Sequence, residues 1–408
     1  MKNFHSLLCQ RKEMAFHAKH SKQPSAIQNE NSRSPRFRQK FLKCFVGDLC
    51  GDLCPPSFRE DPPDDDEVSL IEQVTDDSGL LTVMMEDHKK ASPLFQATAF
   101  WQRYEKLFLP ELYKKGLHDF RRRKNSILAS FGATDILKPE TIGLKIPLLN
   151  KWLSLKFYDD FSHLCSEFAR LYGRQTGARA LEQLTPSLTG NPQYVVDMAG
   201  KKYPISILNY YLRYAYLCQF INFDTISVVT ELGSGSGKQI EVLKKLHPKL
   251  SFLIFDIPPQ LYVCEQYLKA VFPNDVISYR DTKGLSDISS PDSGKIYIFG
   301  SYKFPILESV KTDLFWNAAS LQEIEPEMAK HYLSFVNRSS KAVYLHEWMS
   351  GVREKGKLII ETQLKHYEEA LTNFKKIDLS PAYILPKVRR SENYKDSFWT
   401  REDSSCFP

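Results

Sequence analysis

The sequence of 408 residues lacks any stretch of eighteen uninterrupted apolar residues. The nearest approach, residues 207–223, is broken by Asn209, Arg213, Gln219 and Asn222. A helix that spans a bilayer needs about 20 mostly apolar residues, so we predict a buried core helix here and no membrane span. The first twenty residues also lack the apolar centre of a secretory signal, and we expect no such signal.

Cysteine is scarce and scattered. Of the eight cysteines, only Cys44, Cys50 and Cys54 cluster, and their spacing C-x5-C-x3-C is not a common zinc pattern. Free thiols in a reducing compartment are the default interpretation, and they predict a cytoplasmic protein. No carboxylates and histidines recur at metal-ligand spacing, so we predict no metal site, with magnesium assistance left open as an alternative.

An excess of one charge sign is absent from most of the chain. The formal net charge is +6, but residues 1–46 hold ten basic and two acidic residues, which leaves 45 basic against 47 acidic residues elsewhere. A nearly neutral folded part has no electrostatic reason to bind nucleic acid, and we predict no nucleic-acid partner. Residues 60–67 place six acids beside two prolines. We predict a disordered or low-order tail over residues 1–90.

The chain after the tail has mainly helical patterns. Aromatic and apolar residues recur at helical spacing, in one stripe of Phe100, Trp101, Tyr104, Leu107 and Phe108 and another of Leu153, Phe157, Phe161 and Leu164. We interpret these stripes as core. Tyr210, Tyr211 and Tyr214 are interpreted as core or as a stacking surface for a ligand. The basic run at residues 121–124 is either a solvated helix face or a contact for an anion.

From residue 226 short β-rich runs alternate with helical runs. Strands are predicted at residues 226–232, 250–255, 275–279, 295–299, 314–316 and 342–345, and helices at 238–246, 260–271 and 327–336. Repeated β-α-β units with right-handed crossovers form a parallel, doubly wound sheet. The predicted fold class is therefore α/β and Rossmann-like.

The most informative motif is V-V-T-E-L-G-S-G-S-G-K at residues 228–238. A buried strand leads into a loop with three glycines, where a ligand can approach the backbone beside the positive end of a helix. The spacing differs from the dinucleotide motif G-x-G-x-x-G, and no G-K-[ST] closes a phosphate loop. Glu231 at the strand end repels a pyrophosphate but suits the ammonium group of S-adenosyl-L-methionine.

Asp256 ends the next predicted strand, in F-L-I-F-D-I-P-P, 23 residues after Gly233. A carboxylate there can accept hydrogen bonds from both ribose hydroxyls of a nucleoside. This position alone would serve NAD as well, and Glu231 with the altered glycine spacing favours S-adenosyl-L-methionine. The predicted cofactor-binding residues are Glu231, Gly233, Ser234, Gly235, Ser236, Gly237, Asp256, Ile257 and Asn317.

Four stretches resemble the sugar O-methyltransferase family of class I S-adenosylmethionine-dependent methyltransferases. They are G-N-P at residues 190–192, E-L-G-S-G-S-G, F-D-I-P-P with the helix that follows, and D-L-F-W-N-A-A-S-L-Q-E-I at residues 313–324. The last is the most family-specific and is close to the pattern Asn-x-x-Ser-x-Gln-Glu-Met, with Ile324 in place of the methionine. Ser234, Ser236 and Lys238 also depart from a more glycine-rich loop.

The resemblance implies methyl transfer to a hydroxyl of a sugar or glycan. Removal of the hydroxyl proton calls for a general base near the carboxyl ends of the later strands, and the candidates are Glu323 and His346. Ser320 and Gln322 are predicted to bind the substrate. The expected domains are a tail at residues 1–90, a helical cap and acceptor region at 91–223, a cofactor-binding methyltransferase domain at 224–380 and a C-terminal extension at 381–408.

Two alternatives stay open from the sequence. One is another small-molecule O-methyltransferase with an apolar acceptor, and the other is a methyltransferase-like binding protein without catalysis. Enzymes that methylate nucleic-acid amino groups tend to carry N-P-P-Y after the fourth strand, where this chain reads N-A-A-S. The sequence leaves open the acceptor and the oligomeric state.

Overall fold

The structure, a computed structural model, describes residues 74–135, 162–198, 200–351, 360–385 and 389–401. The cysteine cluster, the acidic run and most of the expected tail lie outside these ranges, as do Leu153, Phe157 and Phe161. Within the described part, no helix has the length and apolarity that a membrane crossing requires.

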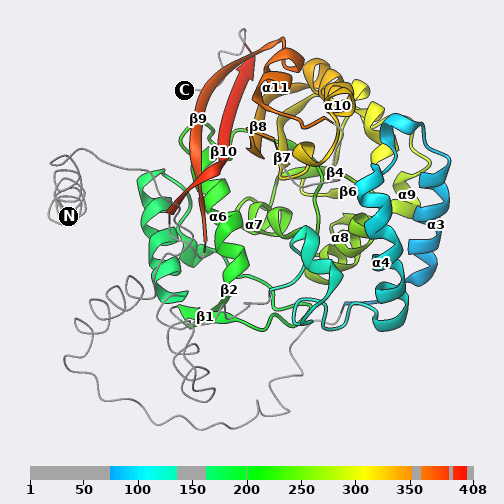
Figure 1. The fold of residues 1–408 in the computed structure, drawn as a ribbon. Coiled ribbons are helices and arrows are strands. Elements are labelled where there is room, and N and C mark those ends of the chain that lie inside the picture. Colours follow the sequence, from blue (N-terminus) through cyan, green and yellow to red (C-terminus); the bar gives the residue numbers. More distant parts are fainter. Residues whose placement is uncertain (1–73, 136–161, 199, 352–359, 386–388, 402–408) are drawn as a thin grey trace, which may run out of the picture. The chain divides into compact units, whose positions relative to one another are not determined.

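The N-terminal half of the described chain is mainly helical (Figure 1). Its elements are α3 (Ser78–Lys89), η2 (Pro93–Phe95), α4 (Ala99–Lys115), η3 (Ile127–Phe131), a helix over residues 162–175, η4 (Leu181–Gln183), the antiparallel pair β1 (Val195–Met198) and β2 (Lys201–Pro204), and α6 (Ile205–Leu217). The predicted core helix within residues 207–223 is confirmed by α6, which buries Tyr211 and Tyr214.

Helix α3 corrects the prediction of low order over residues 1–90. Leu80, Leu81 and Met84 share one face of α3 and are buried, and α3 packs against α8 (Pro258–Val271). Asp77 caps the helix by accepting a hydrogen bond from the Leu80 amide at 2.9 Å. The apolar face that stabilises this helix extends over only about three turns, and the polar residues on both sides obscure it in the sequence.

The C-terminal half alternates strands and helices, as predicted. Its other elements are β3 (Val228–Leu232), α7 (Lys238–Leu246), β4 (Ser251–Asp256), β5 (Val276–Ile277), α9 (Tyr279–Thr282), β6 (Ile296–Gly300), η5 (Ser301–Ser309), β7 (Thr312–Ala318), η6 (Leu321–Glu323), α10 (Pro326–Ser339), β8 (Ser340–Trp348), α11 (Leu364–Ala370), β9 (Phe374–Ile384) and β10 (Arg389–Arg401).

The strands form one eight-stranded sheet in the order β5-β6-β4-β3-β7-β8-β10-β9. Strand β10 is antiparallel to both of its neighbours, whereas the other pairings are parallel. Strand β3, the first strand of this sheet in the sequence, lies in its interior, and later strands pair on both sides of it. This order confirms the predicted α/β, Rossmann-like class I methyltransferase fold. The sheet also includes residues beyond 380, while the domain boundaries themselves stay predictions.

Alternate side chains of each central strand enter two separate cores. In β4, Phe252 and Ile254 pack with α6, α7 and α8, whereas Leu253 and Phe255 pack with η5, α10 and α11. Both faces of the sheet are therefore covered, which explains why the strand sequences are almost continuously apolar. The cavity described below opens where the carboxyl ends of β3 and β7 diverge, at the switch point of such a sheet.

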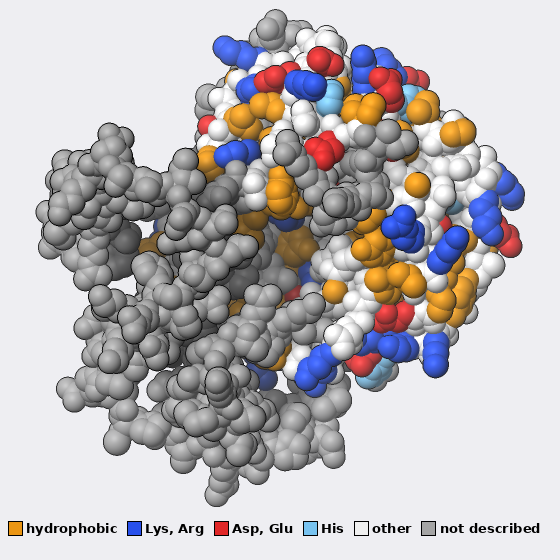
Figure 2. Space-filling view, in the orientation of Figure 1, with side chains coloured by type: hydrophobic (Ala, Val, Ile, Leu, Met, Phe, Trp, Pro, Cys, Tyr) orange, Lys and Arg blue, Asp and Glu red, His pale blue; other side chains and the backbone are white. Residues whose placement is uncertain are grey.

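The basic run at residues 121–124 is divided: Arg122 and Lys124 are exposed but do not lie on a helix, and the other two side chains are buried. Arg121 is buried in an ion pair with Asp135, and Arg123 is buried beside Glu111 and Asp119. These guanidinium groups therefore hold the loop that follows α4 rather than a solvent-facing helix. On the face drawn in Figure 2, the visible basic and acidic side chains are interspersed.

Candidate functional site

The glycine loop connects β3 to α7, and its glycines have the backbone conformation that the motif predicts. Gly233, Gly235 and Gly237 have φ values of 76°, 57° and 80°, which side chains other than hydrogen disfavour. A Cβ atom at Gly233 would lie 2.2 Å from the Oγ of Ser320. The loop after β3 therefore packs closely against the turn after β7, and a larger residue would separate them.

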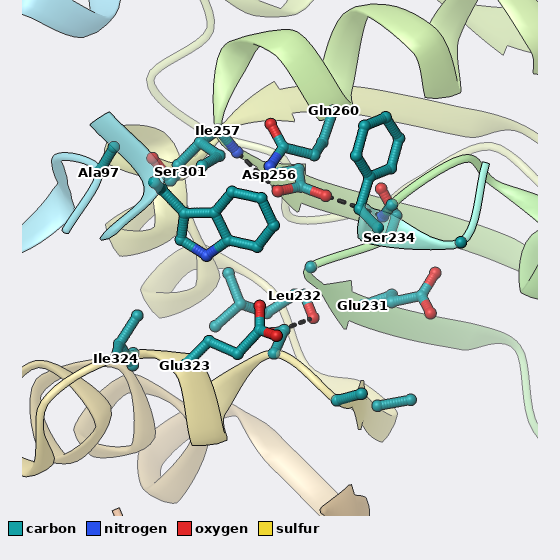
Figure 3. Close-up of a pocket in the computed structure, with 18 of the residues that line it drawn as sticks. Ala97, Glu231, Leu232, Ser234, Asp256, Ile257, Gln260, Ser301, Glu323 and Ile324 are labelled. Atoms are coloured by element: carbon teal, nitrogen blue, oxygen red, sulfur yellow. Dashed lines mark hydrogen bonds between the residues drawn. The ribbon is translucent and has the colours of Figure 1, made fainter. Parts of the chain in front are cut away.

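A cavity of about 290 Å³ lies beside this loop. Figure 3 shows Asp256 and Gln260 on one side of it and Glu323 and Ile324 on another. The sequence-predicted residues that line it are Glu231, Gly233, Ser234, Gly235, Asp256, Ile257, Ser320 and Glu323. Eight of the thirteen predicted site residues therefore share one cavity, although they come from three separate segments of the chain.

Glu231 is a buried acid that forms no ion pair with any residue that the structure describes. Its side chain is 3% exposed, and its Oε2 atom has no hydrogen-bond partner among the described residues. Burial raises the pKa of Glu231 to about 8, while the charge of Arg213 opposes this rise and that of Asp256 adds to it. A cationic ligand would offset the cost of ionising such a carboxyl group.

Asp256 is held by two backbone amides at the end of β4. Its Oδ2 accepts a hydrogen bond from Gly235 and its Oδ1 one from Ile257, both at 2.8 Å. Burial raises the pKa of Asp256 to about 7, and these two amides and Ser234 oppose the rise. Each oxygen retains a free lone pair, so the oriented carboxylate can still accept hydrogen bonds from a pair of hydroxyls.

Asn317 and Gln322 are buried but do not line the cavity. The Nδ2 of Asn317 donates to the carbonyl of Leu232 and to Ser320 Oγ, both at 2.8 Å. Gln322 Nε2 donates to the hydroxyl of Tyr394 at 2.9 Å, and its Oε1 accepts from the amide of Trp348 at 2.6 Å. Both side-chain amides therefore connect the ends of neighbouring strands. Their roles in ligand binding remain predictions.

Ser236 and Gly237 also lie behind the cavity wall. Gly237 is the N-cap residue of α7, and a Cβ there would lie 2.9 Å from Leu268. Ser236 is 2% exposed. The helix packs against α8 at this point, which explains why only the first half of the loop lines the cavity.

The two candidate bases occupy different surroundings. Glu323 ends η6 and lines the cavity. His346 is 3% exposed and outside the cavity lining; its Nδ1 lies 2.7 Å from Asp396 Oδ1, and its ring stacks on Tyr394 with centroids 5.2 Å apart. Burial lowers the pKa of His346 despite the neighbouring carboxylate. Glu323 is therefore the better placed of the two for chemistry in the cavity.

Glu347 stabilises the turn that carries Ser320 and Glu323. This carboxyl group is fully buried and accepts hydrogen bonds from the amides of Ser320 at 3.4 Å and Gln322 at 3.2 Å. Burial raises the pKa of Glu347 to about 8. Nothing in the sequence spacing distinguishes this supporting role of Glu347.

Several lining residues are not predicted from the sequence. They are contributed mainly by the helical half and by β10, and include Gln96, Thr98, Trp101, Arg213, Gln239, Gln260 and Tyr394. Trp101 belongs to the stripe that was interpreted as core, and it is indeed 8% exposed while one side faces the cavity. Gln260 could have been predicted from the sequence, because it lies in the first turn of α8, the helix that follows Asp256.

No protein-family model matches this chain, and no curated protein sequence matches it. Among solved structures, the mitomycin 7-O-methyltransferase MmcR is 12% identical with a TM-score of 0.33, covering 48% of this chain and 54% of that chain. The N-terminal domain of EvdMO1 with SAH bound is 18% identical with a TM-score of 0.30, covering 57% and 96%. The magnesium protoporphyrin IX methyltransferase ChlM from Synechocystis PCC 6803 with bound SAM is 12% identical with a TM-score of 0.29, covering 44% and 72%.

The chain spans about half the length of the first two solved chains that it matches. These identities and TM-scores are low, so the fold assignment rests on this chain's own strand order. S-adenosyl-L-methionine, the cofactor predicted from the sequence, is bound to ChlM, and SAH is bound to the N-terminal domain of EvdMO1.

Proposed function

We propose that this chain is an S-adenosylmethionine-dependent O-methyltransferase whose acceptor is a hydroxyl of a sugar or glycan. The observation that carries the proposal is one cavity in which the unpartnered acid Glu231 and the oriented acid Asp256 flank the glycine loop. The phosphates of a dinucleotide or nucleotide would be repelled by these two carboxylates. S-adenosyl-L-methionine instead has an ammonium group that suits Glu231 and a ribose that suits Asp256.

The residues present fit the cofactor. Glu231 offers an orphaned buried oxygen to the ammonium group, Asp256 offers two oxygens to the ribose hydroxyls, and Gly233 and Gly235 line the same cavity. When bound, S-adenosyl-L-methionine supplies a methyl group already activated on a positive sulfur. The protein then needs chiefly to orient the acceptor and to exclude water.

The acceptor side of the cavity supports a hydroxyl substrate. Glu323 can accept the hydroxyl proton as a general base, and Ser320 and Gln260 offer polar atoms for the remaining hydroxyls of a sugar. His346 is assigned a positioning role, because it holds Asp396 on one side and the ring of Tyr394 on the other. Tyr394 in turn lines the cavity.

An apolar small-molecule acceptor is the second candidate. It is favoured by one observation, the apolar and aromatic wall that Trp101, Met328, Ile324 and Tyr332 contribute to the same cavity. Comparison of sugar acceptors with phenolic acceptors in the same assay separates the two candidates. A chain that binds the cofactor but methylates neither class would favour the non-catalytic alternative.

The first test is calorimetric titration of S-adenosylhomocysteine into the wild type and Asp256→Ala. Loss of the ribose contact removes about 1.5–3 kcal/mol of binding free energy, which is roughly ten- to a hundredfold in Kd. Asp281→Ala removes an exposed acid on α9 and serves as the control with unchanged affinity. Absence of binding to the wild type would contradict the proposed function while leaving the fold intact.

A further inference from the structure

The cavity contains a cation without a counter-ion. Arg213, on α6, lines it and is half-buried. Its guanidinium carbon lies 5.1 Å from the ring centroid of Tyr210, and the structure gives it no hydrogen bond and no ion pair among the described residues. By contrast, the fully buried Arg121 pairs with Asp135 and donates to the carbonyl of Ser187 at 2.9 Å.

Several groups face Arg213 without pairing with it. Its charge acts on Glu231 from β3, on Tyr344, His346 and Glu347 from β8, and on Tyr394 from β10. The two carboxyl groups in this set are themselves buried and have raised pKa values. Arg213 therefore lies between the cofactor loop and the acceptor side, where it is available to a ligand.

A guanidinium group in such a place has a preferred ligand. Its planar donors match a carboxylate in a two-point contact, and it sheds water more easily than an ammonium group does. The face of Tyr210 holds the group in place, which reduces the entropy lost on binding. Because Glu231 lies within electrostatic reach, the two side chains offer opposite charges to one ligand.

We propose that Arg213 binds a carboxylate group inside this cavity. The inference rests on the proposed function, since that function supplies two sources of a carboxylate. One is the amino-acid end of the cofactor, whose ammonium group would lie at Glu231. The other is an acidic acceptor, such as a sugar acid.

The first arm of the test compares S-adenosylhomocysteine with 5′-methylthioadenosine, which lacks the amino-acid end. If Arg213 holds the cofactor's carboxylate, Arg213→Gln weakens S-adenosylhomocysteine at least tenfold in calorimetry and leaves methylthioadenosine unchanged. Arg122→Gln, an exposed arginine of the same charge, is the matched control and alters neither Kd. Arg213→Lys keeps the charge without the two-point contact and is expected to lie between the wild type and Arg213→Gln.

The second arm addresses the acceptor. Glucuronate and glucose are titrated into the complex with S-adenosylhomocysteine. If the carboxylate belongs to the acceptor, Arg213→Gln leaves S-adenosylhomocysteine unchanged but removes the preference of the wild type for glucuronate over glucose. Thermal melts of each variant establish that it is folded, and Arg213→Lys provides the comparison if Arg213→Gln is not.

Two results would overturn the inference. One is equal affinity of Arg213→Gln and the wild type for all four ligands. The other is equal weakening of S-adenosylhomocysteine and methylthioadenosine, which would indicate a general effect on the cavity. If the wild type binds neither S-adenosylhomocysteine nor methylthioadenosine, the proposed function itself is contradicted. Failure of this inference and failure of the proposed function therefore give different results.

Discussion

Two acids flanking the glycine loop are the residues on which the proposed chemistry depends most. Glu231 and Asp256 were identified from their positions at strand ends, and the structure places both in the cavity with raised pKa values. Their ionisation is costly without a ligand because burial removes water from both carboxylates. Under the proposed function, the same pair both recognises the cofactor and destabilises the ligand-free protein.

The base for methyl transfer can be tested directly. We expect Glu323→Gln to lower kcat by about 10²–10⁴-fold, the usual contribution of a general base, with little change in the Kd of S-adenosylhomocysteine. Transfer of labelled methyl groups to the acceptor found by screening measures the effect. Glu327→Gln, an exposed acid at the start of α10, is the control. An unchanged kcat in Glu323→Gln would assign the proton to another group.

At the scale of elements, α7 and the loop after α4 are joined by a buried network of charges. Lys238, the first residue of α7, donates to Asp135 at 3.1 Å and to the carbonyl of Gly132 at 3.0 Å. Asp135 also pairs with Arg121. The lysine that departs from the family pattern thus anchors the cofactor loop to a segment more than a hundred residues earlier in the chain.

Removal of the central acid of this network should be costly. Asp135→Asn leaves two buried cations with one neutral partner, and we expect a loss of about 3–5 kcal/mol of unfolding free energy. Urea denaturation measures it. Asp119→Asn breaks a half-exposed pair with Arg123 and is expected to lose less than about 1 kcal/mol. Equal midpoints for the two variants would show that the network contributes little.

At the scale of the whole molecule, buried carboxyl groups should make stability depend on pH. Glu231 and Glu347 have pKa values raised to about 8, and that of Asp256 is raised to about 7. At a pH between the ordinary pKa values of these carboxyl groups and their raised values, the folded protein keeps protons on them that the unfolded protein has released. Stability therefore falls as pH rises through this window.

We expect the Tm of the ligand-free protein to fall between about pH 6.5 and 8, a range above the ordinary pKa of the buried histidines. Each group contributes up to about 1.4 kcal/mol per pH unit. Glu231→Gln should have a flatter profile and a higher Tm at pH 8, whereas Glu327→Gln should match the wild type. A wild-type Tm that rises across this range would contradict the raised pKa values.

The sequence by itself determined the α/β fold, the order of the main strands and helices from β3 to β8, and the acids at the ends of β3 and β4. These features are local, because each depends on hydrophobic periodicity, on glycine spacing or on position at a strand end. The predicted helix at residues 238–246 has the bounds of α7. The sequence also grouped Ser320 and Glu323 near the site through one family-specific stretch.

Only the tertiary structure decided which polar residues face the cavity. Gln322 lies between the cavity-lining residues Ser320 and Glu323, and His346 lies near the end of β8. Their side chains nevertheless bind Tyr394 and Asp396 on β10. Trp101 and Arg213 come from α4 and α6, and no sequence spacing relates them to the glycine loop. Such placements depend on contacts between distant segments, and packing of the helical half against the sheet is what brings a tryptophan and an unpaired arginine to the cofactor loop.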